Sequence, residues 1–190
     1  MQRRVFSIAV AGLGLVALAC TCSLPKLSGG PVPSATVAVS QEAANRMKKK
    51  LDQASAQVKS GGQFKLTLTE SEITSYMVQE LGKSQDRGEP VPLTNPQIKL
   101  TQNQVWVYGT FIAGTSKFNG LLVVSPTVQG GKLAIKIARA DFGPVPAPGP
   151  MLDQINRQIQ SLLDKESSPD ILLTAITIRE GEVDVTGKGR

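Results

Sequence analysis

Hydrophobic and polar residues alternate along most of the chain after Gly62. The stretch 63–69 places Phe64, Leu66 and Leu68 between polar neighbours, a two-residue period that is typical of a half-buried strand. The same period predicts strands over 98–100, 105–111, 117–128, 133–142, 171–178 and 183–186. Because Gly130-Gly131 separates two of these runs and a Gly-Gly pair favours a tight hairpin, the sheet is expected to be antiparallel.

Three segments instead carry apolar residues at spacings of three and four, which predicts amphipathic helices. The first, 41–59, follows a capping serine. The second begins after the capping box Thr69-Glu70-Ser71-Glu72 and is expected to end at Gly82. The third covers 151–165, after a proline-rich corner. The charged stretch 84–96 contains prolines and is expected to be an exposed loop.

Together these elements predict an α+β fold. Its core is a curved antiparallel sheet of about six to seven strands, wrapped on two amphipathic helices and preceded by a tether and a further helix. An internal repeat supports the order, because Ile98 to Gly109 aligns without gaps to Ile176 to Gly187. Each copy is two short alternating strands around a turn at Asn103 or Gly181.

The N-terminus has the pattern of an export signal. Two arginines are followed by an apolar run over 5–18, which is too short to span a bilayer. Val16-Ala17-Leu18-Ala19-Cys20 resembles a bacterial lipobox, which implies that Cys20 is lipidated after cleavage of a signal over 1–19. Ala17-Leu18-Ala19 equally fits ordinary signal cleavage with free secretion, and an uncleaved anchor is the third possibility.

The positive charge lies near this N-terminus. The chain has a formal net charge of +6, but residues 61–190 hold 13 basic and 13 acidic residues and are neutral. The surplus lies in the signal, in the proline- and glycine-containing tether 20–40 and in the helix 41–60, which carries Arg46, Lys48, Lys49 and Lys50. These four residues either contact an anionic leaflet or form a solvated helix face. The globular domain is expected over 61–190.

The domain resembles a known group of envelope proteins. Phe64-x-Leu66-Thr-Leu68-Thr69-Glu70-x-Glu72-Ile73, followed by strands ending in Val-x-Val-x-Gly, a proline-rich corner, a helix and a last hairpin, is similar to bacterial lipoproteins of the YceB and YpmS type and to LmeA-like proteins. These are related to the tubular lipid-binding (TULIP) superfamily. The resemblance implies a twisted sheet around a helix with an elongated apolar groove for acyl chains.

Seven aliphatic positions are candidates for lining such a groove, or alternatively for a solid core: Ile73, Met77, Leu81, Val105, Val107, Ile155 and Ile159. Trp106 and Tyr108 share a strand face that is either a groove mouth or a half-exposed sheet surface.

Catalysis is not expected. The chain contains no histidine, and its two cysteines cannot complete a zinc site. Glu180, Glu182 and Asp184 lie two residues apart and are interpreted as charges on a solvated edge strand rather than as a metal site or catalytic pair. No cofactor motif is present, and the basic residues do not interleave with aromatic ones as in nucleic-acid-binding proteins.

The sequence therefore predicts a membrane-anchored extracytoplasmic lipoprotein that binds a lipid or another elongated apolar ligand. The alternative is an envelope scaffold or interaction module with a solid core and no ligand.

Overall fold

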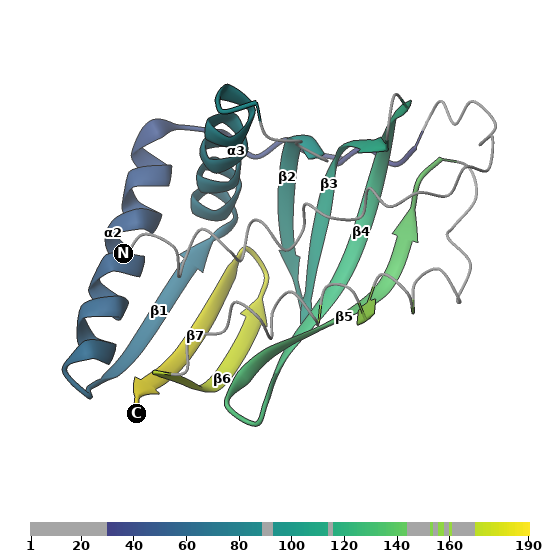
Figure 1. Cartoon of the computed structure of the whole chain (residues 1–190). Helices are drawn as coiled ribbons and strands as arrows, with labels where there is room; N and C mark the ends of the chain where they lie inside the picture. Colours follow the sequence, from purple (N-terminus) through teal and green to yellow (C-terminus); the bar gives the residue numbers. More distant parts are fainter. Residues whose placement is uncertain are drawn as a thin grey trace.

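The computed structural model describes residues 30–88, 93–113, 116–143 and 170–190, together with the single positions 153, 156, 157 and 160. Figure 1 shows the helices and strands within these ranges. They are α2 (Gln41–Lys59), β1 (Gln63–Thr69), α3 (Glu70–Asp86), β2 (Leu93–Thr101), β3 (Gln104–Ala113), β4 (Ser116–Gln129), β5 (Lys132–Asp141), β6 (Ile171–Arg179) and β7 (Glu182–Gly189). Apart from those single positions, the predicted helix 151–165 lies outside the described residues, as does the signal.

The seven strands form two antiparallel sheets. One has the order β1-β7-β6 and the other the order β2-β3-β4-β5. The expected α+β class is confirmed, with the expected strand type and number. The strands are divided between two sheets instead of forming one, and no ladder joins β2 to β6.

The internal repeat corresponds to two equivalent hairpins. In the β2–β3 hairpin Ile98 pairs with Val107, and in the β6–β7 hairpin Ile176 pairs with Val185, the same position in the second copy. Two backbone hydrogen bonds join the hairpins where the sheets meet. Asn103 N donates to Ile178 O over 3.4 Å, and at the equivalent positions Gly181 N donates to Leu100 O over 3.1 Å.

Side chains cover strand edges that the two-sheet arrangement would otherwise leave open. On β2, Leu100 N donates to Glu70 Oε1 of α3 over 2.7 Å. On β5, Ile137 N donates to Asn156 Oδ1 over 2.5 Å. Because an unpaired strand edge can pair with a second chain, these contacts protect the sheets from edge-to-edge association.

Helix α2 belongs to the same core as the strands. Ser40 Oγ accepts from Ala43 N over 3.1 Å, which confirms the predicted cap. Leu51, Ala54 and Val58 are buried in one cluster with side chains of both sheets. The core therefore begins within the helix 41–60 and does not start at residue 61.

Helix α3 is longer than its sequence predicts. The capping box is confirmed, since Glu72 N donates to Thr69 Oγ1 over 3.3 Å and Thr69 N donates to Glu72 Oε2 over 3.1 Å. The expected end at Gly82 is wrong, because the helix continues to Asp86. Glycine at this position keeps an ordinary helical backbone, so it does not stop the helix.

The exposed loop expected over 84–96 is wrong at both ends. Its first residues belong to α3, and β2 already begins at Leu93. Pro96 is fully buried at an irregularity between Thr94 and Gln97 in the pairing of β2 with β3. A bulge accommodates proline because the missing amide donor is not needed there, so this proline does not mark a loop.

The last part of the tether lies on the protein. Residues 30–40, which we call the strap, run across the four-stranded sheet to the start of α2 (Figure 1). Val37 N donates to Gln97 Oε1 over 2.6 Å, and Ser40 N donates to Ser75 Oγ over 3.1 Å. The expectation of a free tether over all of 20–40 is therefore wrong for this segment, because polar groups of β2 and α3 hold it.

Candidate functional site

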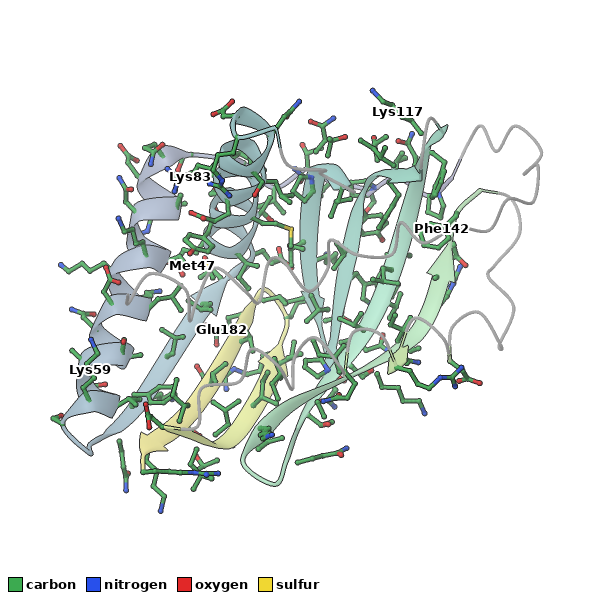
Figure 2. All side chains as sticks on the ribbon, viewed as in Figure 1. Met47, Lys59, Lys83, Lys117, Phe142 and Glu182 are labelled. Carbon is green, nitrogen blue, oxygen red and sulfur yellow. The ribbon has the colours of Figure 1, made fainter. Side chains whose placement is uncertain are left out.

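One continuous apolar surface runs along both sheets, and we call it the inner apolar face. Its side chains come from alternate positions of all seven strands and pack in a single cluster. The members are Phe64, Leu66, Leu68, Ile98, Leu100, Val105, Val107, Phe111, Phe118, Leu122, Val124, Leu133, Ile135, Ile137, Ile171, Leu173, Ile176, Ile178, Val183 and Val185. Figure 2 shows the side chains of the described residues as sticks on the ribbon.

Burial differs along this face. Near α3 it is fully buried, with Leu100 at 0% and Ile98 at 1% exposure. On β5 and β6 burial is mixed: Ile137 and Ile178 are buried, whereas other inner-face side chains of these strands, such as Ile135 and Leu173, are only partly buried. Among the described elements, α2 packs on β1 and β7, and α3 packs on β1 and β2. Strands β4 and β5 lie on the other side of the molecule from both helices (Figure 1).

The structure brings the described groove candidates together in this cluster. Met77 and Val107 are buried in it, while Ile73, Leu81 and Val105 are partly buried and pack against it. The other two candidates, Ile155 and Ile159, lie outside the described residues, as does the proposed lipid anchor Cys20.

Three phenylalanines close one end of the inner apolar face. The rings of Phe111 and Phe142 meet edge to face at a centroid distance of 5.0 Å, and those of Phe118 and Phe142 at 5.3 Å. They come from β3, from β4 and from the residue after β5. The sequence did not single out Phe118 or Phe142, since each is one apolar residue in an alternating strand and their proximity depends on strand pairing.

Trp106 and Tyr108 lie on the opposite, outer face of the four-stranded sheet. Their ring centroids are 6.3 Å apart, and they pack with Leu121 and Val123 in a small separate cluster. This confirms that the two aromatic residues share a face. Between this face and the strap lies a cavity of about 330 Å³, lined by Val37, Gln97, Lys99 and Tyr108 among others.

The four basic residues of α2 do not behave alike. Lys50 Nζ lies 2.7 Å from Glu72 Oε2 and also donates to Thr67 O, and Arg46 Nε lies 3.5 Å from Glu72 Oε1. Glu72 is only 3% exposed. Lys48 and Lys49 are exposed. Two of the four residues thus hold a buried carboxylate of α3, and two face solvent.

The acidic residues at the end of the chain are paired with cations. Lys99 Nζ lies 3.5 Å from Glu180 Oε1, and Arg179 Nη2 lies 2.8 Å from both Glu182 Oε1 and Asp184 Oδ2. The expectation of an edge strand is wrong, because β7 is the central strand of its sheet. In the described ranges, no group of three or more acidic, cysteine or histidine residues is arranged to hold a metal ion.

Asp184 is held as a carboxylate by its neighbours. Thr67 Oγ1 donates to Asp184 Oδ1 over 2.5 Å, Arg179 donates to Oδ2, and Lys65 Nζ lies 3.2 Å from Oδ2. The hydrogen bond from Thr67 and then that from Arg179 lower the pKa of Asp184 from 3.8 to about 2, against the opposing effect of burial.

Asp184→Asn is therefore expected to lower the free energy of unfolding by about 1 kcal/mol at neutral pH. The effect is moderate because Lys65 and Arg179 are largely exposed and their attraction is screened. Because the pKa of Asp184 is lower in the folded state, its carboxylate stabilises the fold at any pH above the unfolded-state pKa. This stabilisation is lost as the pH falls through the folded-state pKa. Urea unfolding should show the difference from wild type shrinking from about pH 4 to about pH 2.

Glu182→Gln is the matched control, because Glu182 also pairs with Arg179 but its side chain is 40% exposed. It should change stability little at any pH. An Asp184→Asn effect that persists undiminished at about pH 2 would contradict the assignment.

Neither a protein-family model nor a curated protein matches this chain. Within the described part of the chain, no helix is both long and apolar enough to cross a membrane.

Proposed function

We propose that this protein is an exported, non-catalytic lipoprotein that binds a lipid or another elongated apolar ligand on the inner apolar face. Its anchor would be a lipid on Cys20, at the extracytoplasmic face of the cell membrane. The observation that carries the proposal is the partial exposure of five aliphatic side chains of β5 and β6 within one continuous apolar cluster: Leu133, Ile135, Ile171, Leu173 and Ile176.

The chemistry of this surface suits an acyl chain. Its side chains are aliphatic or aromatic, and they come from all seven strands. Covering such side chains with methylene groups contributes about 25 cal/mol per Å² of apolar area removed from water. This affinity requires no catalytic group, which agrees with the absence of histidine from the sequence.

The test is ligand binding by the full chain. Native mass spectrometry and analysis of organic extracts should find co-purified lipid, and a fluorescent fatty acid should bind. Ile135→Glu places a carboxylate on the inner apolar face and is expected to weaken probe binding at least about tenfold, because a carboxylate beside an acyl chain loses its hydration.

Lys136→Glu is the matched control, since it introduces the same side chain at the next, exposed position of β5. It should bind the probe as wild type does. Thermal unfolding of both variants separates lost binding from lost folding. If the wild-type chain carries no lipid and takes up no probe, the proposal fails and a ligand-free scaffold with a solid core is the better description.

A further inference from the structure

The chain enters the fold next to the phenylalanine cluster. Gly30, the first described residue, packs on Asn119 of β4 and on Gly143. A Cβ atom on Gly30 would overlap the carbonyl oxygen of Asn119 and would lie 3.1 Å from Gly143 N. Asn119 directly follows Phe118, and Gly143 directly follows Phe142. The tether therefore joins the domain at the end of the inner apolar face that the three phenylalanines close.

The length of the remaining tether limits which surface can lie close to a membrane. Residues 21–29 separate Cys20 from Gly30, so the tether reaches at most about 35 Å when fully extended. Strand β4 runs from Ser116 to Gln129, which is about 45 Å at 3.3 Å per residue. Gln129 lies ten residues, or about 33 Å, farther along β4 than Asn119, which is nearly the full reach of the tether, so the Asn119 end is the one that the anchor holds nearest.

This end also has the composition of a membrane interface. Phe118 and Phe142 are partly exposed, and Val32, two residues after Gly30, is 67% exposed. Lys117 is exposed and has no ion-pair partner among the residues that the structure describes. Aromatic side chains beside a lysine suit the boundary between headgroups and acyl chains.

No exposed negative charge adjoins Phe142 in the chain. The carboxylate of its neighbour, Asp141, is buried and lies 2.5 Å from Arg139 Nη2. Figure 2 labels Lys117 and Phe142 at the same end of the four-stranded sheet, far from the middle of α2.

We propose that this end of the domain, formed by Lys117, Phe118 and Phe142, rests on an anionic phospholipid bilayer. The end of the inner apolar face that the phenylalanines close then lies against the membrane, so a ligand that displaces these rings passes between the face and the bilayer without crossing water. The proposal rests on the lipid anchor of the proposed function. It replaces the basic surface of α2 as the membrane contact, because helix α2 lies on the far side of the molecule from β4 (Figure 1).

The test measures the immersion of exposed side chains in vesicles. The full lipidated chain carries Cys22→Ser, so that Cys20 is acylated and one added cysteine takes a nitroxide label. Labels are placed at Lys117→Cys and, as matched controls, at Gln129→Cys on the opposite end of β4 and at Lys49→Cys on α2. All three positions are exposed.

The vesicles contain phosphatidylethanolamine and phosphatidylglycerol. For each label we compare its collision rate with lipid-soluble oxygen to its collision rate with a water-soluble nickel complex. This ratio should be several-fold higher for the label at 117 than for the labels at 129 and 49. Equal ratios at the three sites, or the highest ratio at 49 or 129, would overturn the proposal. Failure of the chain to float with the vesicles would also overturn it.

The fluorescent fatty acid assay separates this inference from the proposed function. If the probe binds but the label at 117 stays in water, the ligand site stands and the membrane orientation is wrong. If the label at 117 meets the bilayer but no acyl probe binds, the orientation stands and lipid binding is wrong.

Discussion

Replacement of Cys20 by alanine is expected to abolish incorporation of labelled palmitate and to move the protein from the membrane fraction to the soluble fraction. The effect is all or none because the thiol of this residue is the proposed attachment point. Two or more acyl chains hold a protein stably on a bilayer, since each buried methylene contributes about 0.8 kcal/mol. Metabolic labelling followed by membrane flotation measures both effects.

Cys22→Ala is the matched control, since it removes the other cysteine only two residues away. It should keep both the label and the membrane association. Label retained in Cys20→Ala would contradict the assignment. An unlabelled wild-type chain would contradict it as well, and the apparent mass would then distinguish ordinary cleavage after Ala19 from an uncleaved anchor.

Replacement of Glu72 by alanine is expected to lower the free energy of unfolding by about 2 kcal/mol. The carboxylate accepts from Thr69 N at the start of α3 and from Lys50 Nζ of α2, so its loss weakens a helix cap and a contact between helices. Removing one partner of a fully buried ion pair costs about 3–5 kcal/mol. Here the cost is smaller because Lys50 and Arg46 can turn to water, their side chains being 35% and 58% exposed.

The same contacts set the pH dependence of this contribution. Burial by itself raises the pKa of Glu72, but the hydrogen bonds from Lys50 and from Thr69 N outweigh it, and the pKa lies below its ordinary value. A lowered folded-state pKa means that the stabilisation is present at neutral pH and is lost on acidification.

Glu80→Ala is the matched control on the same helix, since the partly buried Glu80 pairs with Lys83, whose side chain is 49% exposed. It should change stability by less than about 0.5 kcal/mol. Urea unfolding at neutral pH measures both variants. Equal losses for Glu72→Ala and Glu80→Ala would show that the buried contacts of Glu72 contribute nothing beyond those of a surface pair.

Strand and turn positions followed from the sequence because they depend on neighbouring residues. The period of two at Phe64, Leu66 and Leu68 reports a pleated strand with one buried face. Gly130 and Gly131 both have positive φ, at 58° and 79°, as a tight hairpin requires. The two copies of the gapless repeat, each predicted to be two strands around a turn, are hairpins with equivalent pairing in the structure.

Patterns of a few residues were misleading where tertiary contacts outweighed them. Gly82 and Pro96 are usual signals for a helix end and a loop, yet one lies inside α3 and the other is buried in a bulge of β2. The strap is composed like a linker, but Gln97 and Ser75 supply acceptors for its backbone. No local property of residues 30–40 encodes those partners, which follow 35 to 60 positions later.

The candidate site also has features that the sequence predicted and features that depended on the tertiary structure. The sequence by itself determined that Val105, Val107 and Met77 are apolar positions on regular elements, and that Cys20 follows a lipobox-like segment. Only the tertiary structure decided that the strands separate into two sheets sharing one inner face, and that Phe111, Phe118 and Phe142 meet where the chain enters. Hydrophobic period specifies which side of a strand is buried, whereas strand order and docking depend on contacts between segments distant in the chain.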